Sequence, residues 1–180
     1  MSLAQRYLQI TNRATTHTNT TTEAAFAAYL TIPAGQLAVG TRLEFGATVE
    51  ATATNSTDTL TCILCIGTAR TSRSTGIQLA TTPASDVADG NIQSLKANAV
   101  VTAIGAASTA ALTYTGEGWL IGATPALVTS GDKAGTLATY FATTSDLYVF
   151  VVADWSAAST GDVATLVDLW CRITPALPSV

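Results

Sequence analysis

The chain has 180 residues and a formal net charge of −4, and only 11% of its residues are charged, against roughly 25% in an ordinary soluble domain. This length suits one domain, and no apolar run approaches the length of a membrane-spanning helix. The eight basic residues are scattered along the chain, which argues against nucleic acid as a partner. Threonine and alanine fill about a third of the positions. A surface so poor in charge predicts a protein that works packed against other subunits.

The first 23 residues read as an extended arm, or as a first strand followed by a threonine-rich linker. Tyr7, Leu8 and Ile10 form a short apolar motif ahead of a nearly pure polar stretch, in which His17 is expected to be a solvated loop residue. Two alternatives stay open. The arm adds to the sheet edge of a neighbouring subunit, or it forms a strand and a loop within its own subunit. No secretory signal is recognisable, so we expect assembly in a cytoplasm.

Residues 24–180 read as a single β domain, because runs rich in β-branched and aromatic residues alternate with turn residues. The clearest strand is 43–52, in which small and large apolar residues alternate with glutamate and threonine. Further strands are expected at 26–32, 59–67, 98–104, 110–114, 119–122, 147–155 and 164–173, with long irregular connections at 70–91 and 124–135. We therefore predict an all-β fold, an antiparallel β-sandwich of jelly-roll-like form with an N-terminal extended arm.

Two of the expected strands, 59–67 and 147–155, are apolar on both faces. Strands of this kind lie centrally in a sheet or meet a partner on their second face. The last strand alternates between a predicted core row and a mixed row that predicts an interface. The core row is Val167, Leu169, Cys171 and Ile173, and the interface row is Leu166, Asp168, Trp170 and Arg172.

The sequence contains no convincing catalytic or metal-binding set. Cys62 and Cys65 have a C-x-x-C spacing, but residues three apart in a strand point to opposite faces and lie about 10 Å apart. Only Cys171 and His17 remain as further ligands of the zinc-binding type. We expect the cysteines to be small buried hydrophobes in a reduced environment. We also expect no metal, no cofactor and no enzymatic activity.

The remaining polar motifs are typical of turns. Six aspartates stand singly in predicted turns, where the side chain caps its own backbone: Asp86, Asp89, Asp132, Asp146, Asp154 and Asp162. The segment 86–91 could gather oxygens around calcium, but it lacks the spacing and the closing glutamate of a calcium loop. The glycine-containing segments 116–118 and 131–135 lack the context of a phosphate loop and are expected to be hairpin turns.

The three tryptophans leave two interpretations open. Trp119, Trp155 and Trp170 could form a platform on which a sugar stacks. Trp155 and Trp170 occur in otherwise apolar strands, however, which favours packing in the core or against another subunit. The candidate interface residues are Tyr7, Leu8, Ile10, Trp119, Leu166 and Trp170.

The segment 22–45 resembles a pattern found in virion structural proteins of tailed bacteriophages. In that pattern a first strand ends in Thr-Ile-Pro-Ala, here residues 31–34, a short turn supplies Leu37 and Val39-Gly40, and a second alternating strand follows. The continuation through 55–67 also fits. Pro33 ends the first strand by removing a ladder donor, and Gly40 permits the turn. The resemblance covers the first third of the chain well and the rest through spacing and composition.

This resemblance implies a phage jelly-roll protein, either a capsid decoration (cement) protein or part of a tail fibre or spike. One domain without a repetitive shaft or heptads favours the decoration protein. The expected partners are the major capsid protein and copies of the chain itself, a homotrimer first and a dimer second, on the capsid surface of the virion. The alternative is a tail fibre, spike or adhesion domain that recognises a host glycan through Trp119.

Overall fold

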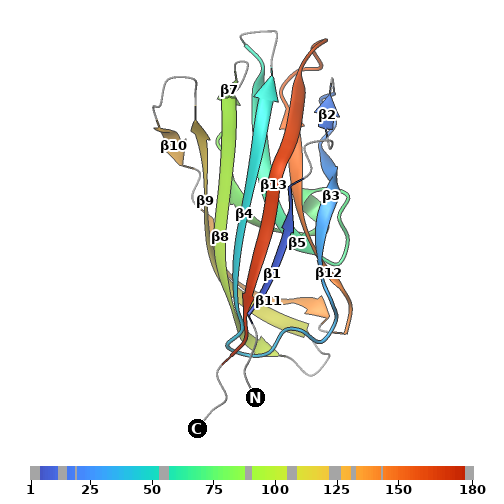
Figure 1. The fold of residues 1–180 in the computed structure, drawn as a ribbon, viewed down its shortest axis with the longest axis vertical. Helices are drawn as coiled ribbons and strands as arrows, with labels where there is room; N and C mark the ends of the chain where they lie inside the picture. The colour runs from blue at the N-terminus through green and yellow to red at the C-terminus, as the bar shows by residue number, and fades with distance from the viewer. Residues whose placement is uncertain are drawn as a thin grey trace.

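A computed structural model describes residues 5–11, 16–18, 20–52, 57–87, 91–104, 109–121, 127–130, 133–142 and 144–176. Within these ranges the chain forms two antiparallel sheets packed face to face, which confirms the predicted jelly-roll-like β-sandwich. The only helical element described is one 3₁₀ turn, η1 (Arg73–Thr75), and no described helix is long and apolar enough to cross a membrane. Figure 1 shows the long strands running along the long axis of the sandwich.

The larger sheet has the strand order β1-β13-β4-β8-β9-β10, with β2 also paired to β13 and β11 also paired to β9. Its strands are β1 (Arg6–Ile10), β2 (Thr16–Thr18), β4 (Arg42–Thr52), β8 (Asn91–Ile104), β9 (Thr109–Ile121), β10 (Leu127–Ser130), β11 (Lys133–Ala142) and β13 (Val163–Thr174). The smaller sheet has the order β3-β12-β5-β6, with β7 also paired to β5. Its strands are β3 (Ala24–Ile32), β5 (Thr59–Gly67), β6 (Ile77–Thr81), β7 (Ser85–Asp86) and β12 (Leu147–Trp155).

Strand β4 shows why the two sheets pack together. Every second residue of β4 from Leu43 to Ala51 is buried between the sheets, as the alternation in the sequence predicts. Each large apolar side chain buried in this way contributes about 1.5–3 kcal/mol to folding. Trp155, at the end of β12, belongs to the same core, which confirms its predicted packing role.

A buried network of hydrogen bonds joins the two sheets inside this core. Gln93 of β8 points inward, and its Nε2 donates to the carbonyl oxygen of Leu60 in β5 at 2.9 Å. Its Oε1 accepts a hydrogen bond from Thr82 Oγ1 at 2.7 Å, and that hydroxyl oxygen accepts from the Cys62 N–H at 2.9 Å. Because these groups satisfy one another, the buried amide fixes how the sheets align at little cost.

The predicted hairpin at 116–118 is wrong. Gly116 and Gly118 lie in the middle of β9, so the two short strands expected at 110–114 and 119–122 are one strand. A Cβ built on Gly116 would stand 1.8 Å from the carbonyl oxygen of Leu79, and one on Gly118 would stand 2.3 Å from that of Thr81. The glycines are present because the backbone of β6 approaches β9 closely there, and not because the chain turns.

The two long connections expected from the sequence contain further strands. Between residues 70 and 91 lie η1, β6 and β7, and β8 begins at Asn91 instead of residue 98. The connection expected at 124–135 contains β10 and the start of β11, while residues 131 and 132 lie outside the described residues. The strands β6, β7 and β10 are short, and short strands carry little hydrophobic alternation. The sequence pattern also missed β11 and the first seven residues of β8.

The N-terminal segment forms strands within its own subunit, which was one of the two arrangements left open by the sequence. Both β1 and β2 pair with β13, at opposite ends of that strand. Leu8 and Ile10 turn toward the core and pack against it. The prediction that His17 is solvated is wrong, because its ring is buried against Phe26, with ring centroids 6.2 Å apart. Neither ring nitrogen of His17 has a hydrogen-bond partner among the described residues.

A β-bulge in β13 corrects the predicted faces of that strand. Leu166 pairs with Val49 and Asp168 with Thr48, so Val167 is an extra residue. The alternation therefore shifts at this point, and Leu166 becomes a buried core residue instead of an interface residue. Val167, expected in the core, is only half-buried. Beyond the bulge the prediction is correct: Leu169, Cys171 and Ile173 face the core, and Trp170 and Arg172 lie on the other face.

Strands β5 and β12 are buried on both faces, as the sequence predicts, and lie centrally in the smaller sheet. Their inner faces join the main core, and their outer faces form a second buried cluster of Ile63, Cys65, Phe150 and Val152. Residues 68–76, here called the strap, lie over this cluster. At its end a Cβ on Gly76 would stand 3.1 Å from Phe150 Cζ.

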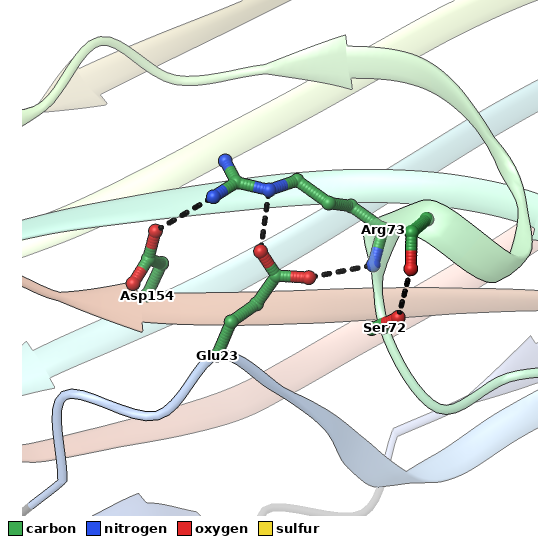
Figure 2. A network of polar contacts seen from close by, with 5 residues as sticks. Glu23, Ser72, Arg73 and Asp154 are labelled. Atoms are coloured by element: carbon green, nitrogen blue, oxygen red, sulfur yellow. Dashed lines mark hydrogen bonds and ion pairs between the residues drawn. The ribbon is translucent and has the colours of Figure 1, made fainter.

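Arg73 holds the strap in place, as Figure 2 shows. Its guanidinium forms ion pairs with Glu23, which precedes β3, and with Asp154 of β12. Its backbone N–H also donates to Glu23 Oε1 at 2.7 Å. Asp154 was predicted in a turn, and this is wrong: its carboxylate lies in a strand and binds the strap.

We expect Gly116→Ala to destabilise the fold strongly. The added Cβ must displace the backbone of β6, so the free energy of unfolding should fall by roughly 2–3 kcal/mol, as overpacking does. Gly35→Ala is the control, because Gly35 has φ of +76° but open space around it, and its cost should be limited to about 1–2 kcal/mol of backbone strain. Urea unfolding measures both, and equal stability of Gly116→Ala and wild type would contradict the close approach.

The buried His17 predicts a loss of stability in acid. Burial lowers its pKa below the ordinary value of 6.5, and the backbone of Thr22 and the carboxylate of Asp154 offset only part of this. As the pH falls below 6.5, His17 binds a proton in the unfolded chain but not in the folded chain. The free energy of unfolding therefore falls by up to about 1.4 kcal/mol per pH unit.

The measurement is urea unfolding of wild type and His17→Leu at about pH 7.5 and about pH 5, on either side of the histidine range. Carboxylates titrate in both proteins, so only the difference between them reports on His17. The leucine variant should lose less stability in acid. An equal loss in both proteins would show that His17 is not responsible.

Candidate functional site

Three of the six sequence-predicted interface residues share one surface, the outer face of the larger sheet. Tyr7 projects from β1, Trp170 from β13 and Trp119 from β9, and none of the three belongs to the buried core. The other three do not reach this surface. Leu8 and Ile10 face inward, and Leu166 is buried at the bulge.

Tyr7 and Trp170 form an aromatic pair, here called the platform. Their rings are nearly parallel, with an interplanar angle of 21° and centroids 6.2 Å apart. The indole covers the backbone of β4 at Gly46, where an added Cβ would stand 2.4 Å from Trp170 Cε2. Tyr7 is 56% exposed. Because Gly46 has no side chain, the Trp170 indole can lie directly against the backbone of β4. This space above Gly46 is here called the seat.

Paired polar groups flank the platform on the same face. Gln9 pairs directly with Trp170 across the strands, and its Nε2 donates to Asp168 Oδ1 at 3.0 Å. On the other side Arg172 forms an ion pair with Glu44 of β4. Each of these groups is held by its partner at a fixed place beside the rings, and each keeps oxygens or N–H groups for further hydrogen bonds.

A further aromatic residue of this face, Trp119 of β9, lies across the sheet from the platform. Lys96 of β8 follows Gly46 in the same register row, and its Nζ lies 5.6 Å from the centroid of the Trp119 ring. Glu117 pairs with Lys96 in the strand register and is exposed. Trp119 is half-buried, so one part of its ring contacts the sheet and the rest faces outward.

The outer face of the larger sheet also gathers charge. The alternation of the described strands places on it the basic residues Arg42, Lys96 and Arg172 and the acidic residues Glu44, Glu50, Glu117 and Asp168. The two signs nearly cancel. Sequence reasoning located three aromatic residues of this face but missed Gly46, whose signal was a glycine on the polar side of a strong strand.

The cysteines are structural in their surroundings. Cys62 lies in the core between the sheets, and Cys65 lies in the cluster under the strap, so they point to opposite faces as predicted. Burial raises the pKa of Cys65 and of Cys171 to about 12, and burial also raises that of Cys62. All three thiols are thus held protonated. Within the described ranges no three histidine, cysteine or acidic residues gather to hold a metal.

The predicted aspartate turns have mixed outcomes. Asp162 follows a turn in which its N–H donates to the carbonyl of Ser159 at 3.2 Å. Asp146 Oδ1 accepts from the Ala34 N–H at 2.9 Å and so links two loops instead of capping its own. Asp86 lies in β7. Asp89 and Asp132 lie outside the described residues, so the calcium alternative at 86–91 is not described as a whole.

No protein-family model and no curated protein matches the chain. Solved structures similar to it include a seed lectin of Lotus tetragonolobus, with 10% identity, a TM-score of 0.39 and coverage of 87% of this chain and 82% of the lectin. A protein of unknown function from Shewanella oneidensis MR-1 has 10% identity, a TM-score of 0.41 and coverage of 98% and 92%. A legume lectin-like domain of Entamoeba histolytica has 10% identity, a TM-score of 0.35 and coverage of 91% and 82%. With TM-scores this low, function has to be argued from the geometry of the chain itself.

The contact between Gly46 and the Trp170 indole can be tested by fluorescence. Gly46→Ala should force the Trp170 indole away from β4, so its fluorescence emission should shift toward that of a solvated indole. The protein should stay folded, because the three atoms nearest to the added Cβ all belong to the Trp170 side chain on the outer face of the sheet, which can move at a cost of about 1 kcal/mol. The same substitution in a Trp170→Phe background should leave emission unchanged. An unaltered spectrum in the single variant would contradict the seat.

Proposed function

We propose that this protein is a non-enzymatic structural protein of a tailed bacteriophage that decorates the outer surface of the capsid and reinforces it. The resemblance of 22–45 to phage virion proteins supports the proposal. That segment forms β3, a turn containing the positive-φ glycines Gly35 and Gly40, and the start of β4. The shortage of charge in the composition supports a surface that is covered by protein.

The observation that carries the proposal is a difference between the two outer faces. On the smaller-sheet side, four of the described charged groups engage one another or an aromatic ring, and one further acid, Asp86 of β7, is exposed. Arg73 pairs with Glu23 and Asp154, and Arg70 lies 3.8 Å from the centre of the Tyr29 ring. The exposed neighbours there include Ala27 of β3 and Ala69 of the strap. Because most of its charges are neutralised by contacts within the chain, this side suits burial against another protein, where it loses water at little cost.

Attachment of many copies does not require a strong single contact. Each copy buries a weakly polar surface on the lattice, and contacts between neighbouring copies add to it through avidity. A homotrimer, or a dimer, on a local symmetry axis of the capsid gives a closed arrangement for such contacts.

A second function, adhesion to a host glycan as part of a fibre or spike, is favoured by one specific observation. Trp119, Trp170 and Tyr7 share the outer face of the larger sheet, as a sugar-stacking surface requires.

The test of capsid decoration is Ala27→Glu, compared with Thr115→Glu on the opposite face. Both positions are exposed in strands, so neither change should unfold the protein. An unpaired carboxylate buried at a protein interface costs several kcal/mol, so Ala27→Glu should reduce the copies per particle at least tenfold. Thr115→Glu should bind like wild type.

Copies per particle are counted by quantitative mass spectrometry, and their place is found by imaging particles assembled with and without the protein. Density on the head shell that disappears without the protein supports decoration. Absence of the protein from the head shell contradicts it, and its presence at the tail tip favours the adhesion function.

A further inference from the structure

We propose that the outer face of the larger sheet is a binding site for a neutral carbohydrate chain, which stacks on the Tyr7–Trp170 platform and extends toward Trp119. This goes beyond capsid decoration, because it assigns a ligand to the face that the proposed lattice contact leaves uncovered. It also gives the adhesion alternative a defined site, centred on the platform instead of on Trp119 alone.

The geometry of the platform suits a sugar ring. A pyranose presents a flat face of C–H groups, which packs on an aromatic face through the same apolar contact that aromatic side chains make elsewhere. Tyr7 and Trp170 provide two nearly parallel rings on an open sheet. Because the indole is seated at Gly46 and packed beside Tyr7, little side-chain freedom is left to lose on binding.

The polar groups around the platform match the hydroxyl rim of a sugar. Hydroxyl groups both donate and accept, so they bind carboxylates as well as amides and guanidinium groups. Gln9 with Asp168 stands on one side of the rings, and Arg172 with Glu44 stands on the other. Four planar polar groups held in pairs beside an aromatic surface form a preorganised hydrogen-bonding frame.

The length of the site indicates a chain and not a single sugar. Trp170 of β13 and Trp119 of β9 are separated by three strand spacings, which is about 14 Å between their strands. Lys96 stands between them and contacts the Trp119 ring. A ligand that reached both tryptophans would therefore cross β4 and β8 over the Gly46 row.

The charge of this face decides against other ligands. With the bases Arg42, Lys96 and Arg172 and four acids, the described side chains of this face carry no excess positive charge to hold phosphates, so a nucleic acid would be repelled. A protein interface core is depleted in lysine, glutamate and aspartate, which are concentrated here. Balanced charges with free hydrogen-bonding capacity fit a neutral ligand rich in hydroxyl groups.

The experiment measures retardation of the full chain in native gels that contain a soluble β-glucan, a mannan or a galactan, and repeats the measurement on a glycan array. At least one neutral polysaccharide should bind. Trp170→Ala should weaken that binding at least tenfold, Tyr7→Ala should weaken it several-fold, and Gly46→Ala should weaken it although all the aromatic residues remain. Val39→Ala, which trims an exposed apolar side chain in the turn between β3 and β4, should bind like wild type.

Three results overturn the proposal: no binding to any of the polysaccharides or array glycans, binding that Trp170→Ala leaves unchanged, or loss of capsid attachment in Trp170→Ala. The last would show that the face is a protein interface. Capsid attachment of Ala27→Glu is measured separately, so failure of the decoration function and failure of the carbohydrate site give different results.

Discussion

The constraint on which this structure depends is that β5 and β12 are apolar on both faces. One face of these strands is covered by the larger sheet, which produces the sandwich and its main core. The other would expose Phe150 and Val152 to water, and the strap covers it. A surface segment can lie over an apolar cluster only if something holds it there. The charged contacts of Arg73 with Glu23 and Asp154 do so.

The same constraint divides the molecule into two unlike outer faces. On the smaller-sheet side, Arg73, Glu23 and Asp154 pair with one another and fix the strap, which leaves few charged groups on the outer surface. On the larger-sheet side, charged and aromatic groups project from long strands that need no further cover. The first face suits a protein lattice, and the second suits a hydroxyl-rich ligand. A protein with both would be held by one face and would present the other to its surroundings.

Much of this fold could be predicted from the residue pattern because long strands with one buried face leave a clear alternation. Strand β4 and the doubly apolar strands β5 and β12 were found in this way with nearly their observed ends. The errors arose where a tertiary contact decided the outcome. Gly116 and Gly118 have the composition of a turn, and only the approach of β6 explains them. His17 lies in a polar stretch, and only its pairing with β13 and contact with Phe26 bury it. The platform was predicted in part, since Tyr7 and Trp170 were both candidates. Their meeting depends on the pairing of β1 with β13, which no local pattern reports.

The bulge at Val167 adds one residue to β13 without turning either end of the strand over. Up to Leu166 the even-numbered residues face the core and beyond Val167 the odd-numbered residues do, so Trp170 and Arg172 point outward while Leu166 stays in the core. A chain that lacked Val167 would place Asp168 directly after Leu166, opposite Thr48 and Val49, so both ends of β13 would keep their present orientation. The strand can therefore lose one residue between Leu166 and Trp170 and keep its outer face, whereas the loss of two would turn the aromatic and polar residues toward the core.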